Sequence, residues 1–294
     1  MLGYRRAVPP RKPSSVGAHV FVAGGLSAAG LPYAERIGAE AVQVFVSNPR
    51  GWAASPGDPA TDESFRGSCA DRKMPVFVHA PYLCNFGSPT EATRDKTAAA
   101  VLHSMRRGAR IGARGVVVHA GSAVEPGVRD VALKTMREVV LPLLDELPDH
   151  SPQLLIEPTA GGGAPLAATV DELAPLFDAL EHHPRLGVCL DTCHAWAAGH
   201  DLAKPGGVRS TLNALVRAVG RGRLGLIHAN DSKDPLGSGR DRHTNIGAGQ
   251  IGVEPFAELF RHPATRNVPV VVETPGDADA HLRDLATLKS LRDR

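Results

Sequence analysis

Eight short apolar runs recur along the chain and are separated by polar or glycine-rich segments. The runs are rich in Val, Ile and Leu, and their shortness is typical of strands that are buried on both faces. They occupy residues 16–20, 41–46, 75–78, 116–118, 153–156, 186–190, 224–227 and 268–272. Stretches rich in Ala, Leu and Arg lie between them and predict helices, for example at 91–110, 130–147 and 170–182.

This alternation predicts a parallel sheet, because a helix between two strands returns the second strand in the same direction. Eight strand–helix units in about 275 residues match a closed (β/α)8 TIM barrel in number and size. A doubly wound open sheet is the alternative, but no G-x-G-x-x-G motif follows the first run. We therefore expect a single α/β domain, a barrel over residues 16–294, preceded by a flexible N-terminal arm at residues 1–15.

The composition is that of an ordinary globular protein and excludes several classes. Apolar residues make up 43% of the chain and charged residues 22%, so a largely disordered chain is not expected. No apolar run approaches the roughly 18 residues of a membrane span. Four cysteines are too few for a disulfide framework, which favours a cytoplasmic protein. A net charge of +2 argues against a bulk polyanion binder but allows a local basic face.

The ends of the strands carry the chemical signal. In a (β/α)8 barrel, functional side chains lie where the strands run into the following loops. Each of the last six runs ends at a His, Asp or Glu, and a single residue of this kind is most simply a strand end entering solvent. Six in succession favour a shared site, made of His79, His119, Glu157, Asp191, His228 and Glu273.

Three more candidates lie nearby in sequence, namely His194, Asp241 and His243. Imidazole and carboxylate without cysteine suit zinc or another borderline first-row ion. Nine ligands are too many for one ion and suit two or three, an arrangement typical of displacement at phosphorus. Cys189 and Cys193 flank Asp191, but a buried apolar role is the better interpretation for a cysteine on the strand.

Seven long motifs make the sequence recognisable. They are GAHVFVAGGL, HAPYLCNFGSP, VVVHAGS, LLIEPTAGGG, GVCLDTCHAWAAGHDL, IHANDSKDPLGSGRDRHTNIGAGQIG and VVETPG. Together they resemble the endonuclease IV (deoxyribonuclease IV) family of apurinic/apyrimidinic (AP) endonucleases, from residue 16 to about residue 289. The resemblance implies a xylose-isomerase-like barrel that hydrolyses the phosphodiester 5′ to an abasic site in duplex DNA. The products would be a 3′-hydroxyl and a 5′-deoxyribose phosphate, with trimming of blocked 3′ ends as a further activity.

The resemblance also implies a zinc-dependent enzyme with three zinc ions per chain. It divides the nine residues into one group per ion: His79, His119 and Glu157; Asp191, His228 and Glu273; His194, Asp241 and His243. Glu157 would bridge the first two ions and act as the catalytic carboxylate. One departure stands beside it, since Pro158 occupies a position where the family usually has Asn, which removes a backbone donor next to the bridging ligand.

Contacts to DNA follow from the same resemblance. In VSNPRGW, Asn48, Arg50 and Trp52 match a loop that enters the minor groove, although Gly51 stands where a longer polar residue is usual. Tyr82 in HAPYL matches the aromatic side chain that fills stacking space at the lesion. Phosphate contacts are expected from Lys233, Arg240 and Arg242, together with Ser232 and the glycine-rich turn at 247–252.

Two other functions compete with this interpretation. A sugar isomerase or epimerase on a related barrel also places Glu, Asp and His at strand ends, but it needs only one or two ions and has no use for the loop 48–52. The second alternative is a catalytically weak, metal-bearing DNA-binding protein. We expect a monomer that acts on duplex DNA with abasic sites or blocked 3′ ends. It is expected to work in the cytoplasm close to the nucleoid and to have no membrane partner.

Overall fold

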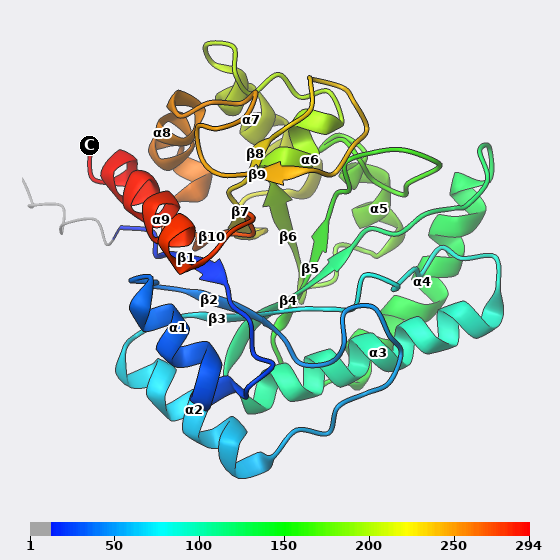
Figure 1. Cartoon of the computed structure of the whole chain (residues 1–294). Coiled ribbons are helices and arrows are strands. Elements are labelled where there is room, and N and C mark those ends of the chain that lie inside the picture. The colour runs from blue at the N-terminus through cyan, green and yellow to red at the C-terminus, as the bar shows by residue number, and fades with distance from the viewer. Residues whose placement is uncertain (1–12) are drawn as a thin grey trace, which may run out of the picture.

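The computed structural model describes residues 13–294, which form a closed barrel of eight parallel strands with helices around it (Figure 1). The order around the barrel is β1-β10-β7-β6-β5-β4-β3-β2, and the pairing of β1 with both β2 and β10 closes it. The barrel strands are β1 (Val16–His19), β2 (Val42–Phe45), β3 (Val76–His79), β4 (Ala113–His119), β5 (Gln153–Glu157), β6 (Leu186–Asp191), β7 (Leu224–His228) and β10 (Val270–Val272). The predicted single-domain (β/α)8 barrel is confirmed.

The helices connect successive strands and cover the outside of the barrel (Figure 1). They are α1 (Leu31–Arg36), α2 (Pro59–Asp71), α3 (Glu91–Arg110), α4 (Arg129–Glu146), α5 (Leu173–Ala179), α6 (Thr192–Ala197), α7 (Gly207–Val219), α8 (Glu254–Arg261) and α9 (Ala278–Arg292). A π-helical turn (Leu26–Gly30) precedes α1, and a 3-10 turn (Pro263–Thr265) follows α8. Among residues 13–294, no helix combines the length and the apolar character needed to cross a bilayer.

Two local differences from the sequence prediction have clear causes. The helix predicted at 170–182 is only α5, because Glu172 caps the turn before it by accepting from the N–H groups of Ala168 and Thr169. At its other end, Glu181 and His182 take positive φ values of 53° and 46°, which an α-helix does not allow. The loop after β7 also contains two short antiparallel strands, β8 (Asp231–Ser232) and β9 (His243–Thr244). The apolar pattern of the sequence did not predict them.

One apolar layer fills the barrel below the strand ends. Its buried side chains are one residue from each of six strands and Ala41 directly before β2: Ala41, Phe77, Val117, Leu155, Cys189, Leu226 and Val271. On β1 the equivalent residue is Gly17, where a Cβ atom would lie 1.7 Å from the carbonyl oxygen of Ala41. Leu155 fills the space left by two glycines, since a Cβ at Gly187 or Gly225 would lie 2.7 Å from its Cδ2. The large side chain of Leu155 therefore packs where two neighbouring strands carry glycine.

The N-terminal segment is described only in part. Residues 1–12 of the predicted arm lie outside the described residues, so the arm remains a prediction there. Ser14 and Ser15 are attached to the barrel: the Ser14 hydroxyl donates to Thr265 O at 3.1 Å, and Val270 N donates to Ser15 O at 2.8 Å. The first strand nevertheless begins at Val16, so these two serines are the part of the predicted arm that lies against the barrel.

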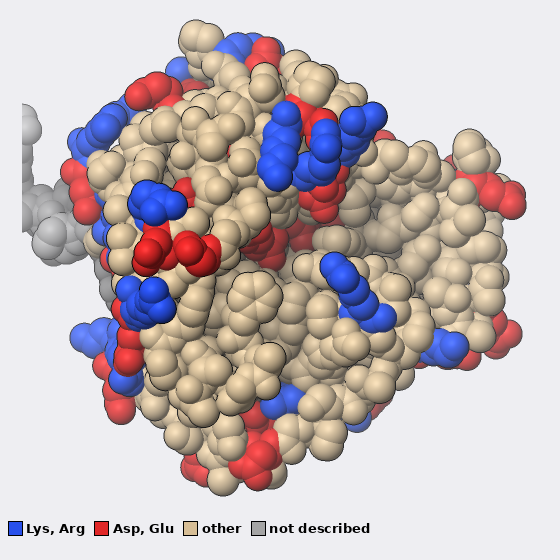
Figure 2. Space-filling model, in the orientation of Figure 1, with Lys and Arg blue, Asp and Glu red and all other residues tan. Residues whose placement is uncertain are grey.

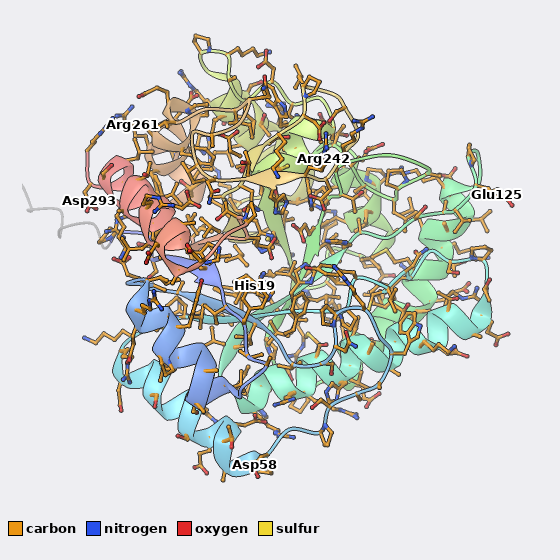
Figure 3. The ribbon with its side chains drawn as sticks, in the orientation of Figure 1. His19, Asp58, Glu125, Arg242, Arg261 and Asp293 are labelled. Carbon is orange, nitrogen blue, oxygen red and sulfur yellow. The ribbon has the colours of Figure 1, made fainter. Side chains whose placement is uncertain are left out.

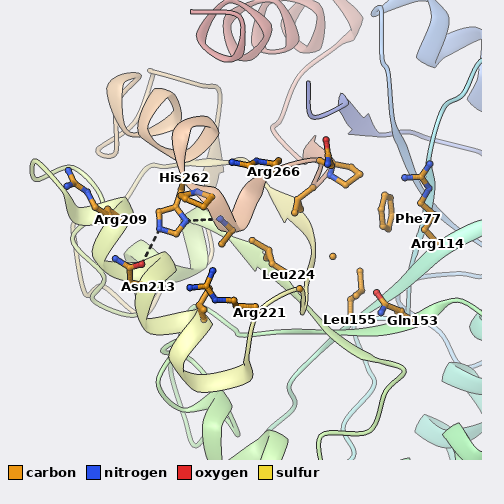
Figure 4. A pocket seen from close by; sticks show the side chains of 18 residues that line it. Phe77, Arg114, Gln153, Leu155, Arg209, Asn213, Arg221, Leu224, His262 and Arg266 are labelled. Carbon is orange, nitrogen blue, oxygen red and sulfur yellow. Dashed lines mark hydrogen bonds between the residues drawn. The ribbon is translucent and has the colours of Figure 1, made fainter. Parts of the chain in front are cut away.

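A cavity of about 760 Å³ opens at the amino ends of the strands (Figure 4). Phe77, Leu155 and Leu224 line it together with polar and basic side chains, and His262 bonds there to Asn213 at 3.3 Å. None of the nine candidate ligands lines this cavity. It lies at the end of the barrel opposite to the strand ends that carry those ligands, so the site is built elsewhere.

We expect Leu155→Ala to lower the free energy of unfolding by about 2–5 kcal/mol, because a buried leucine is lost from a layer that cannot collapse around it. Urea unfolding followed by circular dichroism measures the change. Leu282→Ala is the control, since Leu282 is 45% exposed on α9 and should change stability by no more than about 0.5 kcal/mol. Equal effects of the two substitutions would contradict the account of the layer.

Candidate metal centre

A polar layer lies directly above the apolar one, at the carboxyl ends of the strands. Side chains on a strand return to the same face every second residue, so each strand contributes the residue two positions after its apolar-layer member. The eight residues of this polar layer are His19, Gln43, His79, His119, Glu157, Asp191, His228 and Glu273. Figure 3 labels His19 near the middle of this face. The layer contains all six ligands predicted from strand ends and two residues that were not in that set.

The structure brings the nine predicted ligands together. They fall into three groups in which the candidate ligand atoms lie within 4.8 Å of one another: His79, His119 and Glu157; Glu157, Asp191, His228 and Glu273; His194, Asp241 and His243. Glu157 belongs to two of these groups, and its Oε1 and Oε2 lie 2.9 Å from His228 Nδ1 and 3.3 Å from His79 Nε2. This geometry agrees with the grouping expected from the resemblance.

The short spacing between Asp191 and His194 has a structural reason. Asp191 ends β6 and caps α6, since its Oδ1 accepts from the backbone N–H groups of Cys193 at 2.6 Å and His194 at 3.0 Å. The cap turns the chain so that His194, in the first turn of α6, faces the same space as the strand end. Its Nε2 lies 3.1 Å from Asp241 Oδ2. One capping interaction therefore links the second and third groups.

Asp231 organises the loop that carries His243 and the glycine-rich turn. Its buried carboxylate accepts backbone N–H bonds from Ser232, Gly247, Gly249, Ile251 and Gly252, at 2.8–3.2 Å. The expectation that the turn at 247–252 contacts phosphate through these N–H groups is therefore wrong, because they already have a partner. Ser232 is fully buried, so it is not exposed to a phosphate either.

Hydrogen bonds to backbone carbonyl groups set the orientation of two ligand rings. Nδ1 of His79 donates to Ala80 O at 2.7 Å, and Nδ1 of His194 donates to Pro158 O at 3.1 Å. Each bond leaves Nε2 as the nitrogen that faces the site, as metal-ligating histidines require. Pro158 departs from the family pattern and lacks an N–H group. Its carbonyl group still accepts the hydrogen bond that orients the His194 ring.

Three buried polar atoms of the site have no hydrogen-bond partner in the described residues: Glu157 Oε2, His194 Nε2 and His243 Nε2. The two nitrogens lie 3.1 Å and 2.9 Å from Asp241 oxygens, but the angles do not suit hydrogen bonds. Buried polar groups are rarely left unpaired, and a bound cation would give these three converging atoms a partner. The residues present therefore fit a multinuclear metal centre.

The charges of the site support this interpretation. Burial opposes ionisation of Glu157, yet His228 and neighbouring histidines hold its pKa well below the usual range. Burial likewise opposes the charge on His194 and His243, but Asp191 and Asp241 raise the pKa of His194 to about 10 and that of His243 to about 9. Positive charge next to the carboxylates thus stabilises their ionised form. Imidazolium groups or metal ions can provide that charge.

The cysteines behave as predicted for buried apolar residues. Cys189 lies in the apolar layer, and burial raises the pKa of its thiol to about 12. Burial also raises the pKa of Cys193 to about 12. Both sulfur atoms lie close enough to site residues to join a ligand group, but a thiol that remains protonated is a poor ligand.

The loop with Asn48, Arg50 and Trp52 follows β2 at the rim of the site. The Asn48 side chain accepts from Arg50 N at 2.9 Å, while Asn48 and Arg50 are exposed and Trp52 packs against the hydrophobic core. A Cβ on Gly51 would lie 3.3 Å from Asn48 Nδ2, so the glycine gives the loop its tight turn. A hollow of about 670 Å³ adjoins the loop and is lined by Asn48 and by His19 of the site.

This loop is anchored from below by a buried ion pair. The Arg107 guanidinium donates to the carbonyl oxygens of Val46 at 2.7 Å and Ser55 at 3.1 Å, on the two sides of the loop. Asp62 is 1% exposed and pairs with both Arg107 and Arg110. The sequence pattern does not indicate these anchors, because a charged residue on a helix gives no signal of a contact to a distant loop.

Tyr82 stands between the loop and the metal-site residues. Its ring is 46% exposed, stacks on His119 with centroids 5.8 Å apart, and meets Phe45 edge-on at 5.3 Å. Burial of the hydroxyl end raises the pKa of Tyr82 to about 12, so the phenol stays neutral. The position offers a rigid apolar surface next to the polar layer.

The basic residues predicted to contact phosphate lie in the segment between β7 and α8. Arg240 and Arg242 both lie near the carboxylate of Asp234, with Arg242 Nε donating to Asp234 Oδ2 at 2.6 Å, and Lys233 is exposed. Figure 2 shows Lys and Arg side chains above a hollow with acidic atoms at its floor, at the place where Figure 3 labels Arg242. The face therefore combines an acidic floor with a basic rim.

Two buried amides support the ligands and were not predicted. Asn230 Nδ2 donates to Asp191 Oδ2 at 2.7 Å, and its Oδ1 accepts from Glu273 N at 2.8 Å. Gln43 on β2 contacts His228 and Glu273, although β2 pairs with neither β7 nor β10. A polar residue at an interior position of an apolar strand is the signal that could have identified Gln43.

We expect Asp231→Asn to lower the free energy of unfolding by about 1–3 kcal/mol, because an NH2 group would face backbone N–H groups that then lose their acceptor. Hydrogen exchange at the amides of Gly247 and Gly249 should become faster. Asp95→Asn is the control, since Asp95 is exposed on α3. Unchanged stability and exchange in Asp231→Asn would remove Asp231 as the organiser of this loop.

Comparison with known proteins agrees with this geometry. The family described as "Xylose isomerase-like TIM barrel" matches residues 31–292. A protein named "Probable endonuclease 4" from Streptomyces coelicolor is 59% identical over 285 residues, which cover 97% of this chain and 96% of the relative. Its namesake from Streptomyces avermitilis is 57% identical over 288 residues, 98% of this chain and 93% of the relative.

Solved structures extend the comparison. Endonuclease IV from Thermus thermophilus superposes with a TM-score of 0.82 at 33% identity, covering 95% of this chain and 99% of that one. A D-tagatose 3-epimerase-like protein reaches a TM-score of 0.70 at 16% identity, covering 95% of this chain and 97% of that one, which shows the common fold alone. Full-length identity above one half, the matching barrel and the nine clustered ligands lead to one conclusion: the chain belongs to the endonuclease IV family.

Proposed function

We propose that the protein is a zinc-dependent AP endonuclease, which hydrolyses the phosphodiester 5′ to an abasic site in duplex DNA and leaves 3′-hydroxyl and 5′-deoxyribose phosphate ends. The observation that carries the proposal is the convergence of nine His, Asp and Glu side chains in three groups at the loop end of the barrel. The relatives named endonuclease 4 support the nuclease activity. Trimming of blocked 3′ ends is part of the same proposal, because it breaks the same kind of bond.

Three zinc ions per chain are proposed, one for each group of residues. The first would be held by His79, His119 and Glu157, the second by Glu157, Asp191, His228 and Glu273, and the third by His194, Asp241 and His243. When bound, zinc would supply a water of lowered pKa and positive charge near the phosphate and the leaving oxygen. Zinc is favoured over harder ions because five of the nine ligands are imidazoles.

The chain's own residues bind and orient the substrate around this centre. Glu157 is the proposed catalytic carboxylate, since it is fully buried, ionised and shared by two groups. Its two oxygens face imidazoles from β3 and β7, with Oε2 3.3 Å from His79 Nε2 and Oε1 2.9 Å from His228 Nδ1. The buried polar layer also limits the number of water molecules that can compete at the reacting phosphate.

Recognition of the lesion is assigned to exposed residues at the rim. Asn48, Arg50 and Trp52 would enter the minor groove, and Tyr82 would occupy stacking space vacated at the abasic nucleotide. Lys233, Arg240 and Arg242 would contact phosphates; pairing of Arg240 and Arg242 with Asp234 keeps both guanidinium groups on one side of the site. Because the substrate is genomic DNA, we propose that the protein acts in the cytoplasm at the nucleoid, as a monomer.

The rival function is that of a sugar isomerase or epimerase. Neighbours with that chemistry in their names share the barrel at only 15–16% identity, so they support the fold and not the activity. A third ligand group, made by α6 and the β9 region, exceeds what such an enzyme needs. The second rival, a DNA-binding protein with weak catalysis, differs only in turnover and has to be separated by experiment.

The protein as purified without chelator should contain about three zinc ions per chain, as expected for three separate ligand groups, and should cut a duplex oligonucleotide 5′ to a single abasic site. Elemental analysis gives the metal content, and a denaturing gel with end-labelled strands gives the cleavage position. Strong chelation should abolish cleavage. Glu157→Gln keeps the volume but removes the charge, and it should cut more slowly by several orders of magnitude.

Each rival has its own outcome in this assay. An intact duplex of the same sequence is the control substrate and should remain uncut. Epimerisation of a ketose without cleavage of abasic DNA would establish the isomerase rival, and tight binding of abasic DNA without cleavage would establish the DNA-binding rival. Full activity after removal of all metal would contradict the zinc mechanism itself.

Tyr82→Ala should weaken binding to abasic duplex by about 1–3 kcal/mol and binding to intact duplex by much less, because only the lesion offers a gap for the ring. Tyr82→Phe keeps the ring and is the matched control, with binding close to that of the unaltered protein. Fluorescence anisotropy on both duplexes, with zinc retained, measures the difference. Equal losses on the two duplexes would reduce Tyr82 to a packing residue of the loop.

A further inference from the structure

Gln43 is an unusual residue for its place in the barrel. It lies in the middle of β2 between Val42 and Val44, and its side chain is 0% exposed. β2 pairs with β1 and β3, so the barrel order places two strands, β1 and β10, between Gln43 and the strand of His228. A buried amide is costly unless both its oxygen and its nitrogen find partners. The hydrogen-bond partners of Gln43 therefore indicate its role.

All the contacts of this amide are with residues of the polar layer. Nε2 donates to Glu273 Oε1 at 2.7 Å and lies 2.9 Å from His19 Nδ1. Oε1 lies 2.9 Å from His228 Nε2. Gln43 thus connects His228 on β7 with Glu273 at the end of β10, and both belong to the ligand group around Glu157 and Asp191.

These contacts determine which way the amide points. A carboxylate accepts hydrogen bonds and cannot donate them, so the atom of Gln43 at 2.7 Å from Glu273 has to be the NH2 group. The carbonyl oxygen then faces His228, and it can only accept. Nε2 of His228 must therefore carry a hydrogen atom.

The same reasoning determines which nitrogen of His228 is left for a metal. With Nε2 protonated and bonded to Gln43, the free nitrogen of the neutral ring is Nδ1. This atom lies 2.9 Å from Glu157 Oε1 and 3.2 Å from Glu273 Oε2, within the ligand group. His79 and His194 reach the equivalent state through backbone carbonyl groups, but for His228 the acceptor is a side chain.

We propose that Gln43 is a positioning residue, which sets the tautomer and ring orientation of His228 and fixes the carboxylate of Glu273 for one metal ion of the centre. The inference rests on the proposed metal-dependent function. It assigns no contact between Gln43 and substrate or metal. Its consequence is selective, because Gln43 touches two ligands of one group and no ligand of the His194–Asp241–His243 group.

Gln43→Met tests the proposal, since methionine has a similar length and no hydrogen bonds to offer these ligands. Zinc binding is measured by competition with a chromophoric chelator, and circular dichroism checks the fold. We expect one ion to bind about 10–100-fold more weakly and the others to bind as before, as is typical for the loss of a partner of a metal ligand. Gln153→Met makes the same chemical change at the exposed start of β5 and should leave all ions unaffected.

A second measurement uses the unaltered protein and does not depend on the folding of a variant. In the zinc-loaded protein, nitrogen-15 NMR of histidine side chains should show His228 with zinc on Nδ1 and with a slowly exchanging hydrogen on Nε2. A His228 ring that binds zinc through Nε2 would overturn the proposal. Equal affinity for every ion in Gln43→Met and in the unaltered protein would do the same.

These outcomes are distinct from a failure of the proposed function. Absence of bound zinc and of cleavage in the unaltered protein would remove the metal centre itself, before any variant is considered. Three ions and full cleavage in the unaltered protein, with unchanged zinc affinity in Gln43→Met, would leave the endonuclease intact and remove only the role of Gln43. A merely structural role of Gln43 would lower thermal stability without a selective loss of one ion.

Discussion

The two-residue period of the strands, imposed on a closed barrel, is the constraint on which the site depends. Because β1 pairs with both β2 and β10, equivalent positions on all strands come together as rings. One ring is apolar and contains the large side chains of Phe77, Leu155 and Leu226. The next ring is polar, and the packing below it keeps water out from that side. The candidate site is therefore built on the buried strands of the barrel.

A polar ring in this position places carboxylates where water cannot stabilise their negative charge. Glu157 and Asp191 are buried. Asp241 lies against His194, and Glu273 lies against His228. Buried carboxylates need a nearby positive charge, since desolvation disfavours an isolated anion. Protons on the histidines can meet this need, and so can metal ions, which would also use the lone pairs left without hydrogen bonds. The site is thus suited to exchange protons for metal.

The third ligand group has a different structural origin. Asp191 caps α6 and so places His194, whereas His243 comes from the short β8–β9 pair that the Asp231 carboxylate holds together. The loop at residues 48–52 is likewise held from below, through Arg107. A rigid ring of strand residues is therefore surrounded by loops, each tied down by one buried acid or base, and the loops carry the groups proposed to meet DNA. This division suits an enzyme whose chemistry is constant while its substrate is large and irregular.

The sequence by itself determined the class of fold and most of the site. The apolar runs and their spacing predicted the parallel barrel, and polar residues at the ends of six strands predicted a cluster of candidate metal ligands, because strand period and barrel closure leave little freedom there. The endonuclease IV motifs then supplied the grouping of the ligands. What the tertiary structure alone decided are contacts between residues far apart in the chain. Gln43 meets His228 across the barrel, Asp231 takes the N–H groups that had been expected to bind phosphate, and Arg107 anchors a distant loop. A sequence pattern reports which face of a strand or helix a residue occupies, but the partner of a buried polar group depends on which elements the closed barrel brings together.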